Sequence, residues 1–334
     1  MPTPFAINGL GRIGRALLRI TIERAELQPV AVNDLASAEQ LAGLLARDSL
    51  HGTFEHDIRV ESNQLVVDGK KIRVFNESDP SRIPWEETDA RLVVDATGYC
   101  LTPECAVVHR RGSVQKVIVS ANVRGMDLTV CRGVNDSAYD PLRHHLLSAA
   151  SCTTNCLAPV AFLLHREFGI EAGTLNTVHS YNNDQRLLEF AHRDPRRARS
   201  ATLNMIPTTT SAVEALERVL PELAGRLQGF AVRVPTPNVS LIDVVVQLAG
   251  APSVEEVNGL FAHAAASELA GILAVTEEEL VSSDFLGDSH SAIVDLPLTR
   301  EVQGLYRVVA WYDNEWGHAA RLADLLSLAG GSLK

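Results

Sequence analysis

The sequence predicts an α/β protein whose first part is a doubly wound parallel sheet and whose second part is an α+β domain with a mixed or antiparallel sheet. In the first half, short apolar runs alternate with stretches of helical spacing, which is typical of parallel βαβ units. Beyond residue 150 the strand-like segments are longer and richer in β-branched residues, which suits a sheet with one covered face. The length of 334 residues favours two domains over one core.

The expected elements follow the chain in a simple order. The apolar run PFAIN at 4–8 reads as a buried strand, residues 12–24 have helical spacing, and 29–32 form a second strand that ends at Asn33 and Asp34. Further strands are expected in the first part at 91–95, 116–120 and 128–131. The second part is expected to hold a helix at 151–168, strands at 173–180, 228–235, 239–248 and 305–312, and helices at 253–268 and 318–329.

Charge and composition exclude several classes of function. The formal net charge is -11, from 30 basic and 41 acidic residues, which disfavours nucleic acid and anionic membrane as partners. The N-terminus lacks the pattern of a signal peptide, and no apolar run approaches the roughly 20 residues of a membrane helix. Five irregularly spaced cysteines form neither a disulfide framework nor a metal-ligand pattern. We therefore expect a cytoplasmic protein with no metal site.

Three glycines form a dinucleotide-binding pattern. Gly9, Gly11 and Gly14 spell G-x-G-x-x-G between an expected strand and helix, and Asp34 follows Gly14 by 20 residues. Glycines allow a tight turn and a close approach of a pyrophosphate to the helix N-terminus, while an aspartate accepts hydrogen bonds from ribose hydroxyls. The pattern predicts a Rossmann-type domain that prefers NAD, because Asp34 repels a 2′-phosphate. NADP stays possible, since Arg12 could offset that phosphate, and the alternative is a structural turn with a surface aspartate.

A candidate nucleophile begins the expected helix at 151–168. Ser151 is an expected N-cap, which places Cys152 in the first turn, where the helix dipole is expected to lower the pKa of the thiol. The alternative is a small buried cysteine, which we expect of Cys156. His179 ends an expected strand, and its neutral imidazole could take the thiol proton, although the sequence alone does not single it out from the other histidines.

Arginines point to an anion site in this acidic chain. Arg233 lies in the apolar segment FAVRVPTPNVS, where a charge is costly without an anionic partner. A second group lies in RDPRRAR, which is either a solvated loop or a phosphate site, and it comprises Arg193, Arg196, Arg197 and Arg199.

These segments resemble the glyceraldehyde-3-phosphate dehydrogenase family. The segment ASCTTNCLAP at 150–159 is similar to the active-site signature of that family, and the resemblance extends in the same order over essentially the whole chain, through INGLGRIGR (7–15), DSLHG (48–52), RVPTPNVS (233–240), SSDF (282–285) and WYDNEWG (311–317). It implies an NAD-binding Rossmann domain at 1–150, a catalytic domain at 151–316, a C-terminal helix at 317–334 that packs back on the first domain, and a homotetramer.

The resemblance also implies roles for single residues. Cys152 is the implied nucleophile, His179 the general base, and Asn314 the partner of the nicotinamide carboxamide. The expected cofactor site comprises Gly9, Gly11, Arg12, Ile13, Gly14, Asp34, Thr97, Gly98, Ser120 and Asn314. The expected sites for the substrate phosphate and for inorganic phosphate comprise Ser151, Thr153, Asn182, Asp184, Arg197, Thr210, Ser211 and Arg233. The implied reaction forms a hemithioacetal on Cys152, oxidises it to a thioester, and releases it to phosphate as 1,3-bisphosphoglycerate.

The chain departs from the family pattern at four positions near the site. Asn182 replaces a threonine, Ser211 a glycine, His318 an aromatic residue and Ala149 an asparagine. A side chain at 211 is expected to crowd the inorganic phosphate or to change the loop. These departures keep a rival open, the erythrose-4-phosphate dehydrogenases, which resemble the same family and release the thioester to water.

Other features of the chain weigh on these alternatives. The segments HSY at 179–181 and PTPN at 235–238 favour the glyceraldehyde enzymes over that rival. Ala191, where NAD-specific members often have proline, could leave room for a 2′-phosphate. From another class, a non-catalytic redox or metabolite sensor acting through Cys152 is an alternative, but the presence of Cys152, His179, Arg233 and Asn314 together argues against it.

Overall fold

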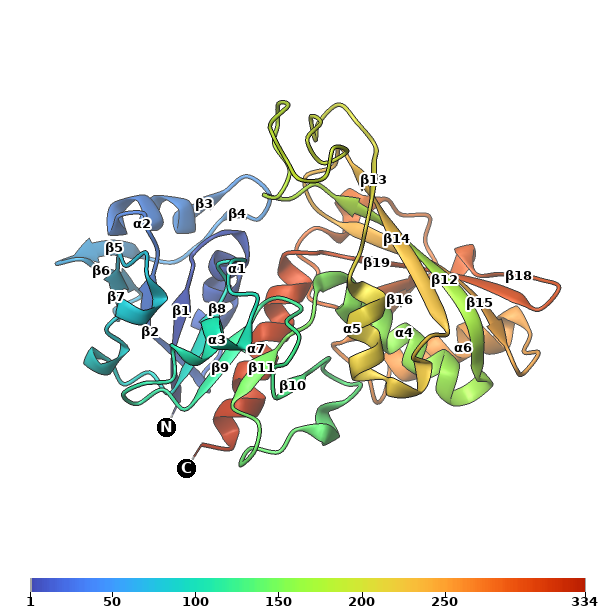
Figure 1. Cartoon of the computed structure of the whole chain (residues 1–334), viewed down its shortest axis with the longest axis horizontal. Coiled ribbons are helices and arrows are strands. Elements are labelled where there is room, and N and C mark those ends of the chain that lie inside the picture. Colours follow the sequence, from blue (N-terminus) through green and yellow to red (C-terminus); the bar gives the residue numbers. More distant parts are fainter. Residues whose placement is uncertain (1, 334) are drawn as a thin grey trace. The chain divides into compact units, whose positions relative to one another are not determined.

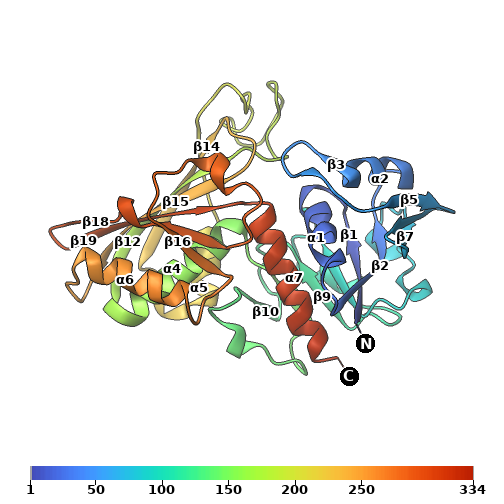
Figure 2. The same cartoon turned by 180° about the vertical axis from the view of Figure 1, so that it is seen from behind.

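The computed structural model describes residues 2–333 and divides into two compact units (Figures 1 and 2). Within the described residues, the first unit comprises 2–132, 136–150 and 319–333, and the second comprises Gly133–Asn135 and Ser151–His318. Both units contain a large sheet with helices, so the predicted α/β class is confirmed. No helix within residues 2–333 is long and apolar enough to span a bilayer.

The first unit is built on a nine-stranded sheet with the order β10-β11-β9-β8-β1-β2-β7-β6-β5. The strands from β10 to β7 pair in parallel, and β5 and β6 extend the sheet as an antiparallel hairpin beside β7. The strands are β1 (Thr3–Asn8), β2 (Leu27–Asn33), β5 (Ile58–Glu61), β6 (Gln64–Val67), β7 (Lys70–Phe75), β8 (Leu92–Asp95), β9 (Lys116–Val119), β10 (Leu128–Thr129) and β11 (Leu146–Ser148), with a separate pair β3 (Arg47–Asp48) and β4 (Gly52–Thr53).

The order of these strands creates a switch point beside β1. The chain runs from β1 through a helix to β2 on one side, and later returns to β8 on the other side of β1. In doubly wound sheets a ligand binds at the carboxyl ends of the strands, where the order reverses. Gly9, Asp34, Ala96 and Ser120 directly follow the carboxyl ends of β1, β2, β8 and β9.

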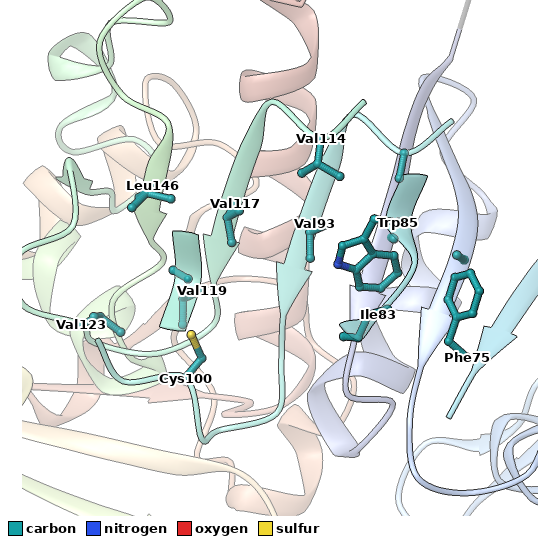
Figure 3. Close-up of a cluster of buried hydrophobic side chains, with 14 residues drawn as sticks. Phe75, Ile83, Trp85, Val93, Cys100, Val114, Val117, Val119, Val123 and Leu146 are labelled. Atoms are coloured by element: carbon teal, nitrogen blue, oxygen red, sulfur yellow. The ribbon is translucent and has the colours of Figure 1, made fainter. Parts of the chain in front are cut away.

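Four helices belong wholly or largely to the first unit: α1 (Arg12–Ile22), α2 (Ala38–Ala46), α3 (Pro103–Val107) and α7 (Trp316–Gly331). Apolar side chains of β8, β9 and the connecting segments form a buried cluster that includes Trp85 (Figure 3). The Trp85 indole meets the Phe75 ring edge-on at a centroid distance of 5.8 Å. The C-terminal helix is tied to this unit by an ion pair of 2.7 Å between Arg24 Nη1 and Asp324 Oδ1.

The second unit holds an eight-stranded mixed sheet with the order β13-β14-β12-β15-β19-β17-β16, and β18 pairs with β19. Helix α4 packs across β15, β17 and β19, with α5 and α6 beside it (Figure 2). The strands are β12 (Ile170–Ser180), β13 (Ile206–Thr208), β14 (Leu227–Val234), β15 (Ser240–Leu248), β16 (Leu273–Thr276), β17 (Ala292–Asp295), β18 (Arg300–Val302) and β19 (Leu305–Tyr312). The helices are α4 (Cys152–Phe168), α5 (Ala212–Val219) and α6 (Val254–Ala265).

The register of this sheet places two functional side chains side by side. β12 pairs in parallel with β14, so that His179 lies opposite Arg233. β12 also pairs antiparallel with β15, which brings the start of β15 to the end of β12. Ser180 and Ser240 therefore come together at the same end of the sheet.

Candidate active site

The glycine loop leaves the N-terminus of α1 open. Gly11 is the N-cap residue, no side chain caps the helix, and the space beside its Cα is empty within 4 Å. Gly9 has a φ of 91°, and a Cβ there would lie 2.9 Å from the backbone of Thr97. A Cβ on Gly14 would collide with the carbonyl oxygen of Gly9. The uncapped N–H groups and the open space beside Gly11 fit the pyrophosphate of a dinucleotide.

The Asp34 carboxylate is held in a fixed orientation after β2. Its Oδ2 accepts from the Leu10 N–H at 2.8 Å, and its Oδ1 accepts from the Ala36 N–H at 3.0 Å. The side chain is half-buried and retains acceptor capacity on both oxygens. This geometry suits a carboxylate that accepts ribose hydroxyls, and its charge opposes a 2′-phosphate.

Arg12 has a partner that the sequence did not suggest. Its guanidinium pairs with the carboxylate of Asp48, and Arg15 lies 3.8 Å from the same carboxylate. Asp48 also accepts from the N–H groups of Leu50 and His51. Hydrogen bonds, Arg12 first among them, outweigh burial and hold the pKa of Asp48 well below its usual value. The charge of Arg12 is therefore already balanced. Ile13 follows it in the first turn of α1.

Thr97, Gly98 and Ser120 lie after β8 and β9, at the same edge of the sheet as the glycine loop. Thr97 is fixed by its hydroxyl, which donates to Asp95 Oδ1 at 2.7 Å, and Gly98 has a φ of 75°. The Ser120 N–H donates to the Asp95 carbonyl at 2.9 Å. All the expected cofactor residues of the first unit are thus gathered at the carboxyl ends of its parallel strands, whereas Asn314 belongs to the second unit.

Cys152 opens α4 as expected. Ser151 is the N-cap, since its Oγ accepts from the Thr154 N–H at 3.1 Å, so this prediction is confirmed. The residue before it, Ala150, has a φ of 56°, which turns the chain sharply into the helix. Cys156, one turn further on, is fully buried, as expected for a structural cysteine.

His179 faces the thiol. Its Nε2 lies 3.4 Å from Cys152 Sγ, and its Nδ1 lies 2.7 Å from the carbonyl oxygen of Ser180. When Nδ1 donates its hydrogen to this carbonyl, Nε2 keeps the lone pair and faces the thiol. The imidazole is therefore oriented to accept a proton from the thiol.

The electrostatics of this pair differ from the sequence expectation. Burial raises the pKa of the Cys152 thiol, and neither Arg233 nor the N–H groups of the first helical turn fully offset it, so the expected net lowering is wrong. Burial, followed by the charge of Arg233, lowers the pKa of His179 to about 3. The pair at neutral pH is therefore a thiol beside a neutral imidazole.

Arg233 lies against this pair from β14. Its Nη1 donates to the Ser180 carbonyl at 3.1 Å and contacts His179 Nδ1. Burial is the main cause that lowers the pKa of Arg233. Among residues 2–333 it forms no ion pair, so a strongly desolvated cation beside the thiol is left without a bound carboxylate.

Asn314 has one end of its amide fixed. Its Oδ1 accepts from the hydroxyls of Ser180 and Ser240, both at 2.9 Å. With the oxygen occupied, the NH₂ group is the end that is left to donate to a ligand. Because Ser180 directly follows His179, the end of β12 carries both the imidazole and a partner of this amide group. The two serines were missed by sequence reasoning, which had no signal that distinguishes them from other serines.

Val239 is a second feature that the sequence did not reveal. It has a φ of 64°, a left-handed conformation that is costly for a β-branched residue, by about 1–3 kcal/mol. It is buried against Phe285 and Ile293. The preceding Asn238 donates to Asp313 at 2.9 Å, which anchors the segment. The strain is retained next to Ser240, which holds Asn314.

Thr153 is turned into the core. Its hydroxyl lies 2.9 Å from Tyr312 Oη, which also lies 3.0 Å from the Thr177 hydroxyl. The ring of Tyr312 meets His179 edge-on at 6.0 Å. The structure therefore places the Thr153 side chain against a buried tyrosine that contacts the His179 ring, while Ser151 serves as the helix cap.

Arg197 and Asp184 are paired in the segment between β12 and β13. Arg197 Nη1 donates to Asp184 Oδ2 at 2.6 Å, and its Nε donates to Thr208 Oγ1 at 2.8 Å. His192 also lies 3.3 Å from Asp184. Burial would raise the pKa of Asp184, but Arg197 and His192 hold it below its usual value. An anion entering here would therefore meet a carboxylate as well as a guanidinium.

The start of α5 and the turn after β12 carry the remaining candidates. Thr210 Oγ1 accepts from the Ala212 N–H at 3.2 Å. Ser211 has a φ of -93°, which any residue adopts, so a serine in place of glycine imposes no backbone strain. Asn182 is exposed, and its Oδ1 accepts from the Asp184 N–H at 3.1 Å in a local turn. Of the other departures from the family pattern, Ala149 and His318 are buried and Ala191 is exposed.

The fold and the site together define a class of enzyme. A dinucleotide-binding sheet in one unit and a thiol–imidazole pair in the other are the parts of an oxidoreductase that binds its substrate covalently. Within residues 2–333 there is no group of three or more histidine, cysteine or acidic side chains that could hold a metal ion.

Comparisons with known proteins give the family. The NAD-binding domain of glyceraldehyde 3-phosphate dehydrogenase matches residues 3–103, and the C-terminal domain matches residues 151–314. The glyceraldehyde-3-phosphate dehydrogenase of Geobacillus stearothermophilus is 48% identical over 326 residues, which are 97% of each chain. Glyceraldehyde-3-phosphate dehydrogenase 1 of Bacillus cereus is 48% identical over 97% of each chain, and glyceraldehyde-3-phosphate dehydrogenase 2 of Streptomyces arenae is 45% identical over 100% of each. The chain belongs to the glyceraldehyde-3-phosphate dehydrogenase family, and its cofactor is NAD.

Proposed function

We propose that this protein catalyses the phosphorylating oxidation of D-glyceraldehyde 3-phosphate to 1,3-bisphosphoglycerate with NAD. The observation that carries the proposal is the Cys152 Sγ to His179 Nε2 distance of 3.4 Å, with Arg233 packed against the same imidazole. We assign cofactor binding to the first unit and catalysis to the second.

Cys152 and His179 carry the covalent steps of this proposal. The thiol proton passes to His179 Nε2 as Sγ attacks the aldehyde carbon, which gives a hemithioacetal. The helix N–H groups at Cys152 stabilise the developing oxyanion. His179 Nε2 returns this proton to the oxyanion, which completes the hemithioacetal hydroxyl, and takes it back as the hydride leaves the carbon. Bound NAD supplies the hydride acceptor, and the thioester stays on Cys152 until a second nucleophile releases it.

The cofactor residues orient the two ends of NAD in this proposal. The N–H groups at Gly11–Ile13 face the pyrophosphate, Asp34 accepts from the adenosine ribose, and Thr97, Gly98 and Ser120 line the same edge. The Asn314 NH₂ group donates to the nicotinamide carboxamide. Since Arg12 is paired with Asp48, it is not available to offset a 2′-phosphate, which supports NAD over NADP.

The two phosphates are assigned to the region of the second unit that carries Arg197 and Arg233. The substrate phosphate is assigned to Arg233, which lies beside Cys152, and to Asp184 and Asn182. Inorganic phosphate, which attacks the thioester, is assigned to Arg197, Thr210, Ser211 and Ser151, and to Thr153 only through its backbone, because its side chain faces Tyr312. The negative φ of Ser211 supports a phosphate loop that tolerates this serine, and this favours the phosphorylating reaction over the erythrose-4-phosphate alternative.

Exposed apolar side chains in the segment between β12 and β13 support the assignment of a homotetramer. Five large apolar residues of this segment are between 62% and 79% exposed in the single chain: Leu187, Leu188, Phe190, Leu203 and Met205. Exposed apolar surface of this kind is typical of subunit contacts. We also place the enzyme in the cytoplasm, which suits its five free thiols.

The decisive experiment follows NADH absorbance with purified protein, NAD and glyceraldehyde 3-phosphate, with and without inorganic phosphate. Erythrose 4-phosphate is tested in parallel. Phosphate-dependent reduction with the triose is expected. Phosphate-independent reduction that favours the tetrose would move the assignment to the erythrose-4-phosphate enzymes, and no reduction with either aldehyde would favour the sensor alternative.

A further inference from the structure

A buried polar network lies beneath the cofactor-binding edge of the first unit. Its centre is the Asp95 carboxylate at the end of β8, which is 1% exposed. Oδ2 accepts from Asn8 Nδ2 at 2.8 Å and lies 3.3 Å from His109 Nε2. Oδ1 accepts from the hydroxyl and the N–H of Thr97, at 2.7 and 3.1 Å. Four donors thus converge on one buried carboxylate.

The hydrogen bond from Trp85 fixes the tautomer of His109 in this network. The indole Nε1–H can only donate, and it lies 3.0 Å from His109 Nδ1. His109 Nδ1 is therefore the lone-pair nitrogen, and the hydrogen on Nε2 points at Asp95. Trp85 is fixed in the apolar cluster, where its ring meets Phe75 edge-on (Figure 3), so its N–H is held in place by packing. Burial would raise the pKa of Asp95, but hydrogen bonds from His109, Thr97 and Asn8 lower it.

The residues that Asp95 holds are the neighbours of the cofactor-binding residues. Asn8 precedes Gly9, and Thr97 precedes Gly98. Asn8 Oδ1 in turn accepts from Asn33 Nδ2 at 2.8 Å, and Asn33 precedes Asp34. One network therefore sets three turns on three adjacent strands, β1, β2 and β8.

The turns after β1 and β8 are packed closely against each other. A Cβ on Gly9 would lie 2.9 Å from the Cα, N and Cγ2 atoms of Thr97, so Thr97 sits directly against the glycine loop. If Asp95 loses a donor, the carboxylate and Thr97 shift together, and the pyrophosphate-binding loop shifts with them.

We propose that His109, held by Trp85 and acting through Asp95 and Thr97, is a positioning residue that sets the glycine loop for NAD. The proposal rests on the assignment of NAD to this edge of the sheet. His109 touches neither substrate nor cofactor in this account, and it is used by none of the chemical steps described above. Its effect is therefore expected on cofactor affinity and not on the rate of the chemical step.

The test replaces His109 by Leu, which keeps the volume and removes the donor. The Kd for NAD by calorimetry and the KM for NAD should rise about tenfold, which corresponds to about 1.4 kcal/mol. The kcat at saturating NAD and the KM for the aldehyde should change less than about twofold. His109→Gln, whose amide can donate to Asp95 and accept from Trp85, should restore most of the affinity.

A matched control separates positioning from general loss of stability. Lys116 is 1% exposed in β9 of the same sheet, and its Nζ donates to the carbonyls of Pro141 and His144, at the end of β9 opposite to Ser120. Lys116→Met should lower the Tm and leave the Kd for NAD unchanged. Equal losses of NAD affinity in Lys116→Met and His109→Leu would overturn the proposal.

A second variant covers the case in which His109→Leu does not fold. Trp85→Phe removes the N–H that fixes the tautomer together with part of the buried ring system, and it should raise the Kd for NAD about threefold. An unchanged Kd in the folded variants would refute the positioning role. A wild-type protein that does not bind NAD would instead refute the cofactor assignment on which the proposal rests.

Discussion

Ser180 and Ser240 offer a direct test of how Asn314 is oriented. Both hydroxyls donate to Asn314 Oδ1 at 2.9 Å, but only Ser240 has a second role, because its Oγ accepts from the Ser180 N–H at 3.1 Å. All three residues are at least nine-tenths buried. We therefore expect the two alanine variants to differ, although they remove the same chemical group.

The magnitudes follow from what each variant leaves behind. Ser180→Ala removes one hydrogen bond and leaves Asn314 with one partner, so the free energy of unfolding should fall by about 1 kcal/mol. Ser240→Ala removes the same bond and also leaves a buried backbone N–H without its acceptor, so the loss should be about 2–4 kcal/mol. The double variant leaves the Asn314 oxygen buried without a partner. The side-chain amide can then rotate so that its oxygen and NH₂ group exchange places.

Two assays measure these effects. Urea unfolding gives the stabilities, and initial rates give the KM for NAD. Each single variant should raise this KM modestly, while the double variant should raise it about tenfold or more, with a coupling energy of at least about 1 kcal/mol. Equal stabilities of the two single variants, or strictly additive effects on KM, would refute this account of the site.

Further predictions concern the nucleophile, the ribose partner and two charges. Cys152→Ser should abolish turnover and leave NAD binding intact, as measured by calorimetry; turnover near wild type would refute the covalent mechanism. Asp34→Ala should weaken NAD and relatively favour NADP in initial rates, and an unchanged preference would remove Asp34 from the ribose site. His179 has a folded pKa of about 3 against an unfolded value near 6.5, so the unfolded chain takes up a proton first as the pH falls. Stability should fall by up to about 1.4 kcal/mol per pH unit between these values, and His179→Gln should flatten this slope in urea unfolding. Arg233 lowers the pKa of Cys152, so Arg233→Met should move the alkylation of Cys152 by iodoacetamide to higher pH, and an identical pH profile would contradict this.

The sequence predicted the parts of the fold that have a strong local signal. The strand–helix–strand unit at 4–34 appears as β1, α1 and β2, because buried parallel strands are continuous apolar runs and the glycines mark the turn. The hairpin of β5 and β6 was not predicted, because β5 is a short edge strand with alternating charged residues. Helix α2 was also missed, although Ser37 and Gln40 form a capping box that marks its start.

The candidate site was predictable only where single residues carry the chemistry. Cys152 could be placed at a helix N-terminus from Ser151 and the apolar stretch that follows. The network of Ser180, Ser240 and Asn314 depends on the register of β12 against β15, which no local pattern encodes. The pKa of Cys152 was predicted in the wrong direction, because burial is a property of the folded chain and outweighs the helix terminus.

The ion pair between Arg24 and Asp324 joins positions 300 residues apart. The first unit therefore includes the last helix of the chain, although its sheet is encoded almost entirely by the first 150 residues. At a synthesis rate of about 5–20 residues per second, roughly 15–60 seconds separate the two partners on the ribosome. During that time the nascent nucleotide-binding sheet lacks one of its covering helices, and the surface that α7 later covers is open to chaperones and to wrong partners. The earliest part of the protein can thus finish folding only after α7 has been synthesised.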